Sequence, residues 1–445
     1  MPWSRSDRPV PRLVLRPLQS FLQTEASGGV LLLVATVVAL AWANSPWQGS
    51  YERFLHAELA IRLGRWGVSE DLQHWVSDAA MTLFFLVVGL EIKRELLTGE
   101  LRDPRAVALP AIAALGGMLL PAAIYLVFNV GGPGSRGWGI PMATDPAFAI
   151  GLLTLAARAA PPSVKSFLLT LAIVDDIGAI VVLALFYSGR IDWAAVTVAA
   201  LLCLVILGVQ RINVRASGLY VLLGVGVLLA TLNSGVHPTI AGVALGFLTP
   251  AAAFQRPRAV SDEAHRIANE TVDDPFPPDA DAHHWLRLTD LSREAIPPLA
   301  RIEHVLHPWT SYVIVPLFAL VNAGVVLSSE ALRDAVANPI TLGVAFGLVI
   351  GKTVGVSLAS LIAVRLGFAR LPTGATLRHV VGTAAVAGIG FTVSLFVAEL
   401  AFPDPLRQGA AKIGILAASV LAGVLALVVF RSTRDVGPMV VEDAR

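Results

Sequence analysis

The chain has 445 residues, of which 55% are hydrophobic and only 15% are charged. Soluble globular proteins carry about 25% charged residues, so this composition argues against a water-soluble protein. Lysine and arginine total 33 and aspartate and glutamate total 32, and this balance lacks the basic surplus that binding to nucleic acid usually needs. The single cysteine, Cys203, excludes an intrachain disulfide and a cysteine-based metal site. The composition therefore predicts a protein of the lipid bilayer with no nucleic-acid partner.

Long stretches without Asp, Glu, Lys or Arg predict the spanning helices, because one crossing needs about 20 mostly apolar residues. Charge-free runs cover 26–51, 106–130, 194–210, 216–255, 307–329, 379–398 and 413–430, and the fourth run is long enough for two helices. Four more helices tolerate internal charges, at 76–92, 138–157, 166–187 and 338–364. The sequence thus predicts an all-α integral membrane protein with 12 transmembrane helices. These runs lack the alternation of a barrel wall.

The first run also has features of a signal peptide. A basic flank precedes it, and Ala41-Trp42-Ala43 resembles a cleavage site. Because eleven further predicted spans need no cleaved leader, a first spanning helix is the favoured interpretation.

The positive charges of the loops predict the orientation. Of the 33 Lys and Arg residues, 24 fall on the side of the N-terminus and 7 on the other side, which places both termini of a multi-pass membrane protein in the cytoplasm. The predicted regions are a cytoplasmic N-terminus at 1–26, helices 1–8 at 27–250 with an external segment at 45–74, a polar cytoplasmic loop at 251–307, helices 9–12 at 308–431 and a cytoplasmic tail at 432–445.

Two of these connections have patterns of their own. The external segment contains Ile61-Arg62-Leu63-Gly64, which alternates weakly and predicts a short hairpin. In the cytoplasmic loop, the stretch from Asp273 to Asp279 has the composition of a disordered linker, and His284 to Ile296 is expected to form an amphipathic surface helix.

Two adjacent carboxylates lie inside the predicted fifth helix. A carboxylate at the centre of a spanning helix costs roughly 2.5–3.5 kcal/mol, so Asp175 and Asp176 are a functional hypothesis by default. Neighbouring positions lie about 100° apart around a helix, so the two can share one cavity but not one role. Like charges this close raise at least one pKa, and a group that loses its proton near neutral pH can exchange H⁺ for a small cation. The alternative is a structural pair neutralised by Lys352, which would leave one negative charge over.

The predicted fourth and eleventh helices contain breaks. Pro146 removes a backbone donor, so Thr144 or Asp145 is expected to cap a second half-helix, although a plain proline kink is the alternative. The eleventh helix is weakened by Gly388 and Gly390. The two helices cross in opposite directions and could meet at the midplane, where Asp145 would offset the positive half-helix ends and Lys352 the negative ends.

These motifs together resemble the NhaA-type sodium/proton antiporter family over nearly the whole chain. The matching stretches are Phe84 to Leu96, Ala143-Thr144-Asp145, Ala172 to Ile180, Ser234 to His237, Glu303 to Trp309, Gly351-Lys352 and Gly388 to Thr392. The resemblance implies an inverted repeat of helices 3–5 and 10–12 with broken helices 4 and 11. It also implies an ion and proton site in which Asp176 and Asp175 bind the transported Na⁺, with Asp145, Thr144 and Lys352 around them.

The resemblance further implies exchange of cytoplasmic Na⁺ or Li⁺ for external H⁺, electrogenic and regulated by pH, in a homodimer that pairs through the external hairpin and has no cofactor. The chain departs from the family pattern at Pro146, where the family commonly has Ile, and in the length of the 251–307 loop.

A cytoplasmic group of charges is the second candidate site, and the resemblance implies a pH sensor there. Its members are Glu91, Arg94, Glu95, Glu303, His304 and His307. The first three share one helix face, and histidine titrates between about pH 5 and 8. The alternative is a set of solvated helix-end charges.

Two other classes of protein also place carboxylates in a membrane. An intramembrane aspartyl protease needs them on different helices beside a Gly-x-Gly-Asp element, which the sequence lacks. A cation channel needs acidic rings in an oligomeric pore, whereas this chain has one cluster. Both are disfavoured, and a transporter without enzymatic activity is the prediction.

Overall fold

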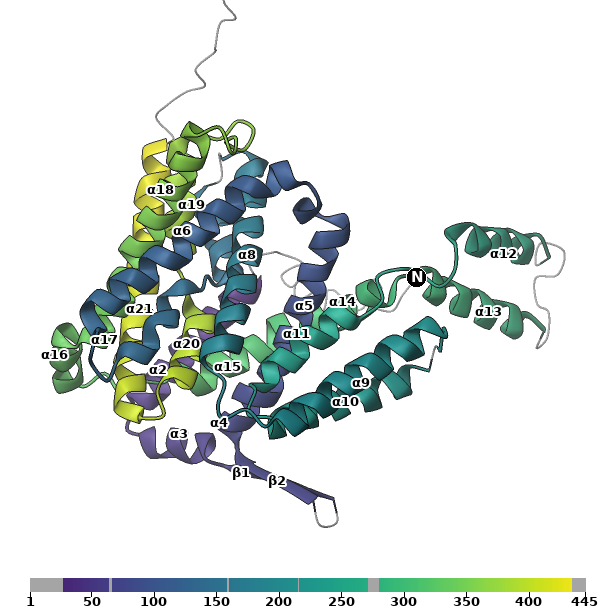
Figure 1. Ribbon diagram of the computed structural model, residues 1–445, viewed down its shortest axis with the longest axis horizontal. Helices are drawn as coiled ribbons and strands as arrows, with labels where there is room; N and C mark the ends of the chain where they lie inside the picture. Colours follow the sequence, from purple (N-terminus) through teal and green to yellow (C-terminus); the bar gives the residue numbers. More distant parts are fainter. Residues whose placement is uncertain (1–26, 64–65, 158–159, 215, 271–279, 434–445) are drawn as a thin grey trace, which may run out of the picture. The chain divides into compact units, whose positions relative to one another are not determined.

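The computed structural model describes residues 27–433 except 64–65, 158–159, 215 and 271–279. It divides into two compact units (Figure 1). Unit 1 comprises Met1–Met81, Leu96–Gly189 and Ser311–Arg445, and unit 2 comprises Thr82–Glu95 and Arg190–Thr310. The predicted N-terminal segment 1–26, the linker from Asp273 to Asp279 and nearly all of the predicted tail lie outside the described residues.

Unit 1 is helical apart from one hairpin. Its elements are α2 (Ser27–Ala43), α3 (Gln48–Leu55), β1 (Glu58–Leu63), β2 (Trp66–Asp71), α4 (Leu72–Trp75), η3 (Val76–Ala80), η4 (Glu100–Arg102), α6 (Pro104–Asn129), η5 (Ser135–Met142), α7 (Pro146–Ala156), α8 (Pro162–Phe186), η6 (Thr310–Ile314), α15 (Val315–Asn322), α16 (Ser329–Ala337), α17 (Pro339–Phe346), η7 (Gly347–Gly351), α18 (Lys352–Arg365), α19 (Leu377–Ala387), α20 (Phe391–Ala401) and α21 (Pro405–Thr433). The strands β1 and β2 pair antiparallel, with Glu58 opposite Asp71 and Leu63 opposite Trp66. The predicted hairpin therefore forms.

Unit 2 contains most of α5 (Met81–Thr98) together with α9 (Trp193–Arg211), α10 (Ser217–Asn233), α11 (Pro238–Leu248), α12 (Pro257–Glu270), α13 (Ala280–Ala295) and α14 (Pro298–Trp309). Within it, α9 and α10 run side by side (Figure 1).

Helices long and apolar enough to cross a membrane follow the predicted runs. Seven described helices meet this test, or up to ten if each of three bent helix pairs is one span. Two further predicted spans coincide with the shorter apolar helices Gly218–Asn233 and Pro238–Leu248. The second of these has 11 residues and is about 16 Å long, so by itself it is shorter than a bilayer core of about 30 Å.

Many of these helices begin with a polar cap followed by proline. Asp103, Asp145, His237 and Asn338 each accept a backbone N–H of the first turn, and a proline follows each of them at the first helical position. Proline suits this position because its missing N–H would have no partner there and its φ is already helical. The cap and the proline explain where the spans begin better than the last charged residue does.

Three boundaries differ from the prediction. The run 26–51 is not one helix, because α2 ends at Ala43 and the chain turns by 119° into α3 through a segment that contains Pro46. The ninth span begins at Pro298 and not at 308, because Pro298 starts α14 although charges follow it. The 251–307 loop contains the helices α12 and α13 before that point, and α13 covers most of the surface helix expected at 284–296.

The core of unit 1 lies where α6 packs against α17 and α18 and where α19 packs against α21 (Figure 1). Small residues bring two of these helices into backbone contact. A Cβ added to Gly116 of α6 would lie 2.4 Å from the carbonyl oxygen of Gly355 in α18, and the reverse distance is 2.3 Å. In a lipid bilayer, apolar surface provides no hydrophobic driving force for helix association. Close van der Waals packing of this kind is therefore a principal source of the attraction between helices.

We predict that Gly116→Ala destabilises the protein by about 1–3 kcal/mol, the usual range for overpacking a well-packed contact. The melting temperature in detergent, followed by circular dichroism, should fall by several degrees. The matched control is Gly423→Ala in α21, whose added Cβ would meet Leu152 at an ordinary 3.6 Å. Because alanine is about 1 kcal/mol more favourable than glycine in a helix, the control should hold or gain stability. Equal melting temperatures for the two variants would contradict the backbone contact.

Candidate ion site at the broken helices

The chain leaves helical geometry between η5 and α7. Residues Ala143 to Asp145 are extended, and the helix axes on either side differ by 44°. The Asp145 side chain caps α7 by accepting the backbone N–H of Phe148 at 3.1 Å, and Pro146 is the first helical residue. The break predicted at Pro146 is therefore present, with Asp145 as its cap.

A second break, of 45°, separates α19 from α20 at Gly388 to Gly390 and touches the first. The backbone N–H of Asp145 donates to the carbonyl oxygen of Ile389 at 2.7 Å. A Cβ added to Gly390 would lie 2.6 Å from the carbonyl oxygen of Ala143, so glycine is required for this approach. Backbone groups that an unbroken helix would use internally thus join two separate chain segments.

The Asp145 carboxylate holds the starts of both half-helices. While Oδ1 accepts from Phe148, Oδ2 accepts from the backbone N–H of Thr392 at 3.1 Å and from its hydroxyl at 2.7 Å. A helix N-terminus carries a partial positive charge, so an anion shared by two such ends is favourably placed. Asp145 was expected to offset the positive ends of the half-helices, and it lies at the N-terminal ends of both α7 and α20.

The Asp175 carboxylate and the Lys352 ammonium form an ion pair that is closed to solvent. Nζ of Lys352 lies 2.5 Å from Oδ2 of Asp175, and both side chains are 0% exposed. The hydroxyl of Thr144 lies 2.8 Å from the same oxygen and 2.9 Å from the carbonyl oxygen of Ala387, at the end of α19. Its single hydrogen can serve only one acceptor at a time, so the hydroxyl can turn between the two.

One oxygen of this pair has no hydrogen-bond partner among the described residues. It is Oδ1 of Asp175, which is fully buried. Buried polar atoms are nearly always hydrogen-bonded, so an exception calls for an explanation. A carboxylate oxygen in this position can accept a proton or a hard cation, which prefers oxygen ligands. The described residues contain no group of three or more His, Cys, Asp or Glu that could hold a resident metal ion.

The predicted site residues therefore separate into two sets. Thr144, Asp175 and Lys352 contact one another, whereas Asp145 is engaged by Thr392 and the two helix ends. Asp176 follows Asp175 on α8, is partly exposed and takes part in other interactions. Thr392 was not predicted as a ligand of Asp145. The sequence feature that could have indicated its role is its position two residues after Gly390, at the break of the eleventh helix.

The second candidate site is centred on Arg94 in unit 2. Its guanidinium is paired with Glu303 through NH1 and lies 3.4 Å from Glu95 through NH2. Glu91 interacts electrostatically with all three residues. Glu303 is buried, whereas Arg94 is exposed. The sequence motifs on α5 and α14 thus meet as predicted, through an arginine between carboxylates.

The two histidines of this group differ from the expectation. His304 and His307 lie on α14 itself, not before a helix, and both are exposed. The ion pairs of Glu303 and Glu95 in this group are made with Arg94. The ninth helix begins at Pro298, which places both histidines within α14.

Comparison with known proteins adds the family. A family model described as Na⁺/H⁺ antiporter 1 matches residues 19–430. The chain is 46% identical over 430 residues to the Na⁺/H⁺ antiporter NhaA 3 of Frankia alni, with 95% of this chain and 91% of that protein covered. It is 45% identical over 432 residues to NhaA 2 of Sorangium cellulosum, with the same coverage. It is 44% identical over 418 residues to NhaA of Janthinobacterium sp., covering 92% of this chain and 91% of the relative.

Three observations agree with the resemblance of the motifs. The chain has many apolar helices, two of its helices are broken and joined through Asp145, and Asp175 and Lys352 form a buried ion pair. The near-complete matches to these relatives point the same way. The chain belongs to the NhaA Na⁺/H⁺ antiporter family.

Proposed function

We propose that this chain exchanges cytoplasmic Na⁺ or Li⁺ for external H⁺ at Asp175 and Asp176. The observation that supports this most directly is the buried Asp175–Lys352 pair, whose carboxylate keeps one oxygen without a hydrogen bond among the described residues. A cation entering this site would use that oxygen, Asp176 and the Thr144 hydroxyl, which can turn its hydrogen toward Ala387 and offer a lone pair. Protons and cations would then compete for the same carboxylates.

The proposal extends to the arrangement in the membrane. The chain would cross the bacterial inner membrane 12 times with both termini in the cytoplasm, as the 24 positive charges on that side suggest. Helices 3–5 would correspond to α6, η5 with α7, and α8, and helices 10–12 to α17 with α18, α19 with α20, and α21, as two inverted repeats. The β1–β2 hairpin would be external and would pair two copies as a homodimer.

We predict that Asp176→Asn abolishes Na⁺-driven proton movement while the protein inserts and melts as the wild type does, because Asp176 is partly exposed and its amide replacement has nearly the same shape. Asp175→Asn should abolish exchange as well and should also lower the free energy of unfolding by about 3–5 kcal/mol, since it leaves the buried Lys352 without its counter-ion. The measurement is cation-induced collapse of ΔpH in everted vesicles with Na⁺, Li⁺ and K⁺, beside melting in detergent.

The control for these variants is Asp334→Asn, an exposed carboxylate on α16. The double variant Asp175→Asn with Lys352→Met should regain stability without regaining exchange, since it removes both charges. Wild-type exchange in Asp176→Asn would overturn the assignment of the cation site.

Exchange at this site would move net charge. When Na⁺ takes the Asp175 carboxylate, Lys352 loses its counter-ion in a place closed to water, and a buried unpaired ammonium is strongly disfavoured. Lys352 would then release its proton together with the proton that leaves Asp176. Two protons per Na⁺ leave one net charge in each cycle, which the membrane potential drives by about 2.3 kcal/mol per 100 mV.

We therefore predict that the exchange rate in proteoliposomes rises when valinomycin and a K⁺ gradient set a potential, negative inside, that draws in the excess protons. Lys352→Gln, which removes one of the two proton carriers, should exchange without this dependence on voltage. Rates of the wild type that are equal at 0 mV and at an imposed potential would exclude electrogenic exchange.

Regulation by pH is proposed for the Arg94 group. Loss of the Arg94–Glu303 ion pair would release Arg94, and Glu91 and Glu95 would then compete for that cation. The rearrangement would close the cytoplasmic access to the site at acid pH. Competition of protons at Asp175 and Asp176 gives some acid inhibition by itself, so the regulatory role must be tested at saturating Na⁺.

We predict that Glu303→Gln, which resembles the protonated glutamate, moves the pH–activity curve toward alkaline pH by about 0.5–1 unit with little change in maximal rate. His304→Ala should shift the curve less, because its imidazole is exposed. Asp262→Asn, an exposed carboxylate on α12 of the same unit, is the control and should leave the curve unchanged. A wild-type profile for Glu303→Gln at saturating Na⁺ would leave competition at the aspartates as the only pH control.

A further inference from the structure

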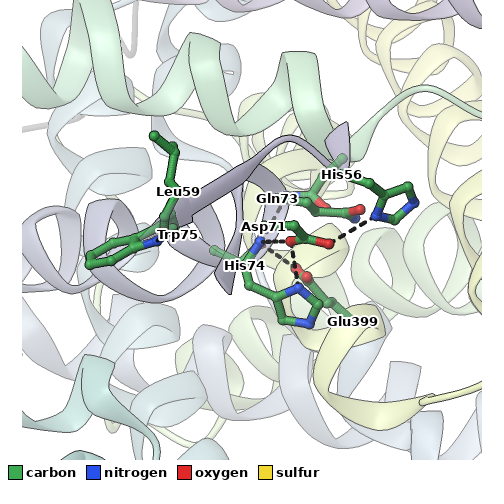
Figure 2. A network of polar contacts seen from close by, with 9 residues as sticks. His56, Leu59, Asp71, Gln73, His74, Trp75 and Glu399 are labelled. Carbon is green, nitrogen blue, oxygen red and sulfur yellow. Dashed lines mark hydrogen bonds and ion pairs between the residues drawn. The ribbon is translucent and has the colours of Figure 1, made fainter. Parts of the chain in front are cut away.

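A second set of polar side chains lies in unit 1 near the hairpin, apart from the Asp175 site, and two of its members, Ser77 and Asn322, are buried. Three hydrogen bonds connect the set in series from Gln73 to Glu399, and Figure 2 shows these two end residues. Nε2 of Gln73 donates to Oδ1 of Asn322 at 3.0 Å, and Nδ2 of Asn322 donates to the Ser77 hydroxyl at 3.2 Å. That hydroxyl donates to Oε2 of Glu399 at 2.8 Å. The carboxylate of Glu399 is the final acceptor and the ionisable member of these four residues.

The charged groups that act on Glu399 come from three elements, α4, η3 and α21. Lys412 of α21, Asp78 of η3 and His74 of α4 act on its carboxylate electrostatically. Lys412 is buried in an apolar helix, where an ammonium requires a nearby anion. Two carboxylates and one lysine are thus gathered here, the same set of groups that Asp175, Asp176 and Lys352 provide at the broken helices.

Helix α20 connects the two places. Thr392, which binds Asp145, and Glu399 are seven residues apart, so they lie on the same face of α20 and about 10 Å apart along its axis. Phe396 lies between them and is fully buried. Its ring is 6.3 Å from that of Phe318 in α15. An aromatic pair therefore separates Glu399 from the Asp175 site along the helix.

Near Glu399, the Asp71 carboxylate lies between the imidazoles of His56 and His74 (Figure 2). The Asp71 carboxylate lies 2.8 Å from Nδ1 of His56 and 2.6 Å from Nδ1 of His74, and the two imidazole side chains are 65% and 61% exposed. Partial burial by itself raises the pKa of Asp71, but the hydrogen bonds from His74 and His56 outweigh it and hold that pKa below its usual range. Asp71 therefore stays anionic between the two exposed imidazoles.

We propose that Glu399 is the residue at which external protons are loaded before they reach the Asp175–Asp176 site. A proton bound from the external solution at the His56–Asp71–His74 group would move to an oxygen of Glu399, converting the carboxylate to the neutral acid. It would move on to Asp175 or Asp176 when the Phe396–Phe318 contact opens and Na⁺ has left. Ser77 and Asn322 are positioning residues, because they orient the accepting carboxylate. The proposal rests on the proposed exchange of Na⁺ for external H⁺.

The test is Na⁺ efflux from right-side-out proteoliposomes at fixed internal pH and Na⁺ while the external pH is varied. With Glu399→Gln, the rate at external pH 8.5 should fall at least about tenfold below that of the wild type, because proton capture then limits the cycle. At external pH 6, where protons are abundant, the rate should stay within about twofold, and the KM for internal Na⁺ should not change. Glu399→Asp should restore most of the alkaline rate. Glu52→Gln, an exposed carboxylate on α3 that binds Gln48, is the matched control and should follow the wild type.

Two results would overturn the proposal. One is an unchanged dependence on external pH in Glu399→Gln, and the other is an equal loss at every external pH, which would indicate a structural role only. If Glu399→Gln does not fold, Ser77→Ala keeps all charges and should give the same alkaline loss in weaker form.

A second measurement separates this proposal from the proposed function. Infrared difference spectra of oriented bilayers between external pH 6 and 9 should contain a carboxylic acid band that Glu399→Gln lacks. Absence of such a band overturns loading at Glu399 even where the wild type exchanges normally. A wild type that moves no protons with Na⁺ but retains the band refutes the proposed function and, with it, the passage of this proton to the aspartates.

Discussion

The buried ion pair between Asp175 and Lys352 constrains the rest of unit 1. An isolated charge with no exposure to solvent costs several kcal/mol even after relaxation, so each of these groups requires the other for as long as the site is closed. The Thr144 hydroxyl also donates to the Asp175 carboxylate, from a segment that has left helical geometry. In an unbroken fourth helix, the backbone groups of this segment would form hydrogen bonds within the helix. Thr144 would then be part of the regular helix and not of an extended segment.

The two chain breaks are stable because each provides what the other lacks. The start of α20 has a free N–H and a threonine hydroxyl, and the start of α7 has a carboxylate that can accept both while capping its own helix. Gly390 allows the backbones to come within contact distance. Asp145 is therefore a structural anion at the crossing of the two broken helices. An acidic residue inside a membrane protein can thus have a structural role of its own.

Much of this could be predicted from the sequence, because membrane crossings depend on composition and the break at Pro146 depends on local backbone chemistry. Charge-free runs located most of the apolar helices, and the intramembrane charges Asp175 and Lys352 indicated the residues of the buried pair. Their ends were less predictable: Pro298 starts α14 inside a stretch that looks polar, and α2 turns into α3 at Ala43 inside a stretch without charge. The rule counts charges, whereas the helices begin and end at caps and prolines.

Contacts between different helices could not be predicted from the sequence. Nothing in the spacing of Glu399 and Lys412, which lie on different helices, showed that both are charged groups within one polar cluster. The predicted run 379–398 stopped one residue before Glu399 because that residue is charged, so it was assigned to a helix end. Likewise, the motif that contains Thr392 indicated a weak helix and gave no sign of its partner Asp145.

In the proposed exchange at Asp175, coupling between the ions follows from the ion pair itself. While Lys352 occupies the Asp175 carboxylate, the charge that would attract Na⁺ is already compensated, and a cation can bind only where the ammonium gives way. Occupation by Na⁺ and occupation by the protonated lysine therefore exclude each other by Coulomb repulsion at a distance of a few ångströms in a medium of low dielectric constant. A water-filled pore would screen that repulsion and allow a leak. The fully buried aromatic ring of Phe396 along α20 keeps the medium apolar and thus preserves the exclusion on which an exchanger, as opposed to a channel, depends.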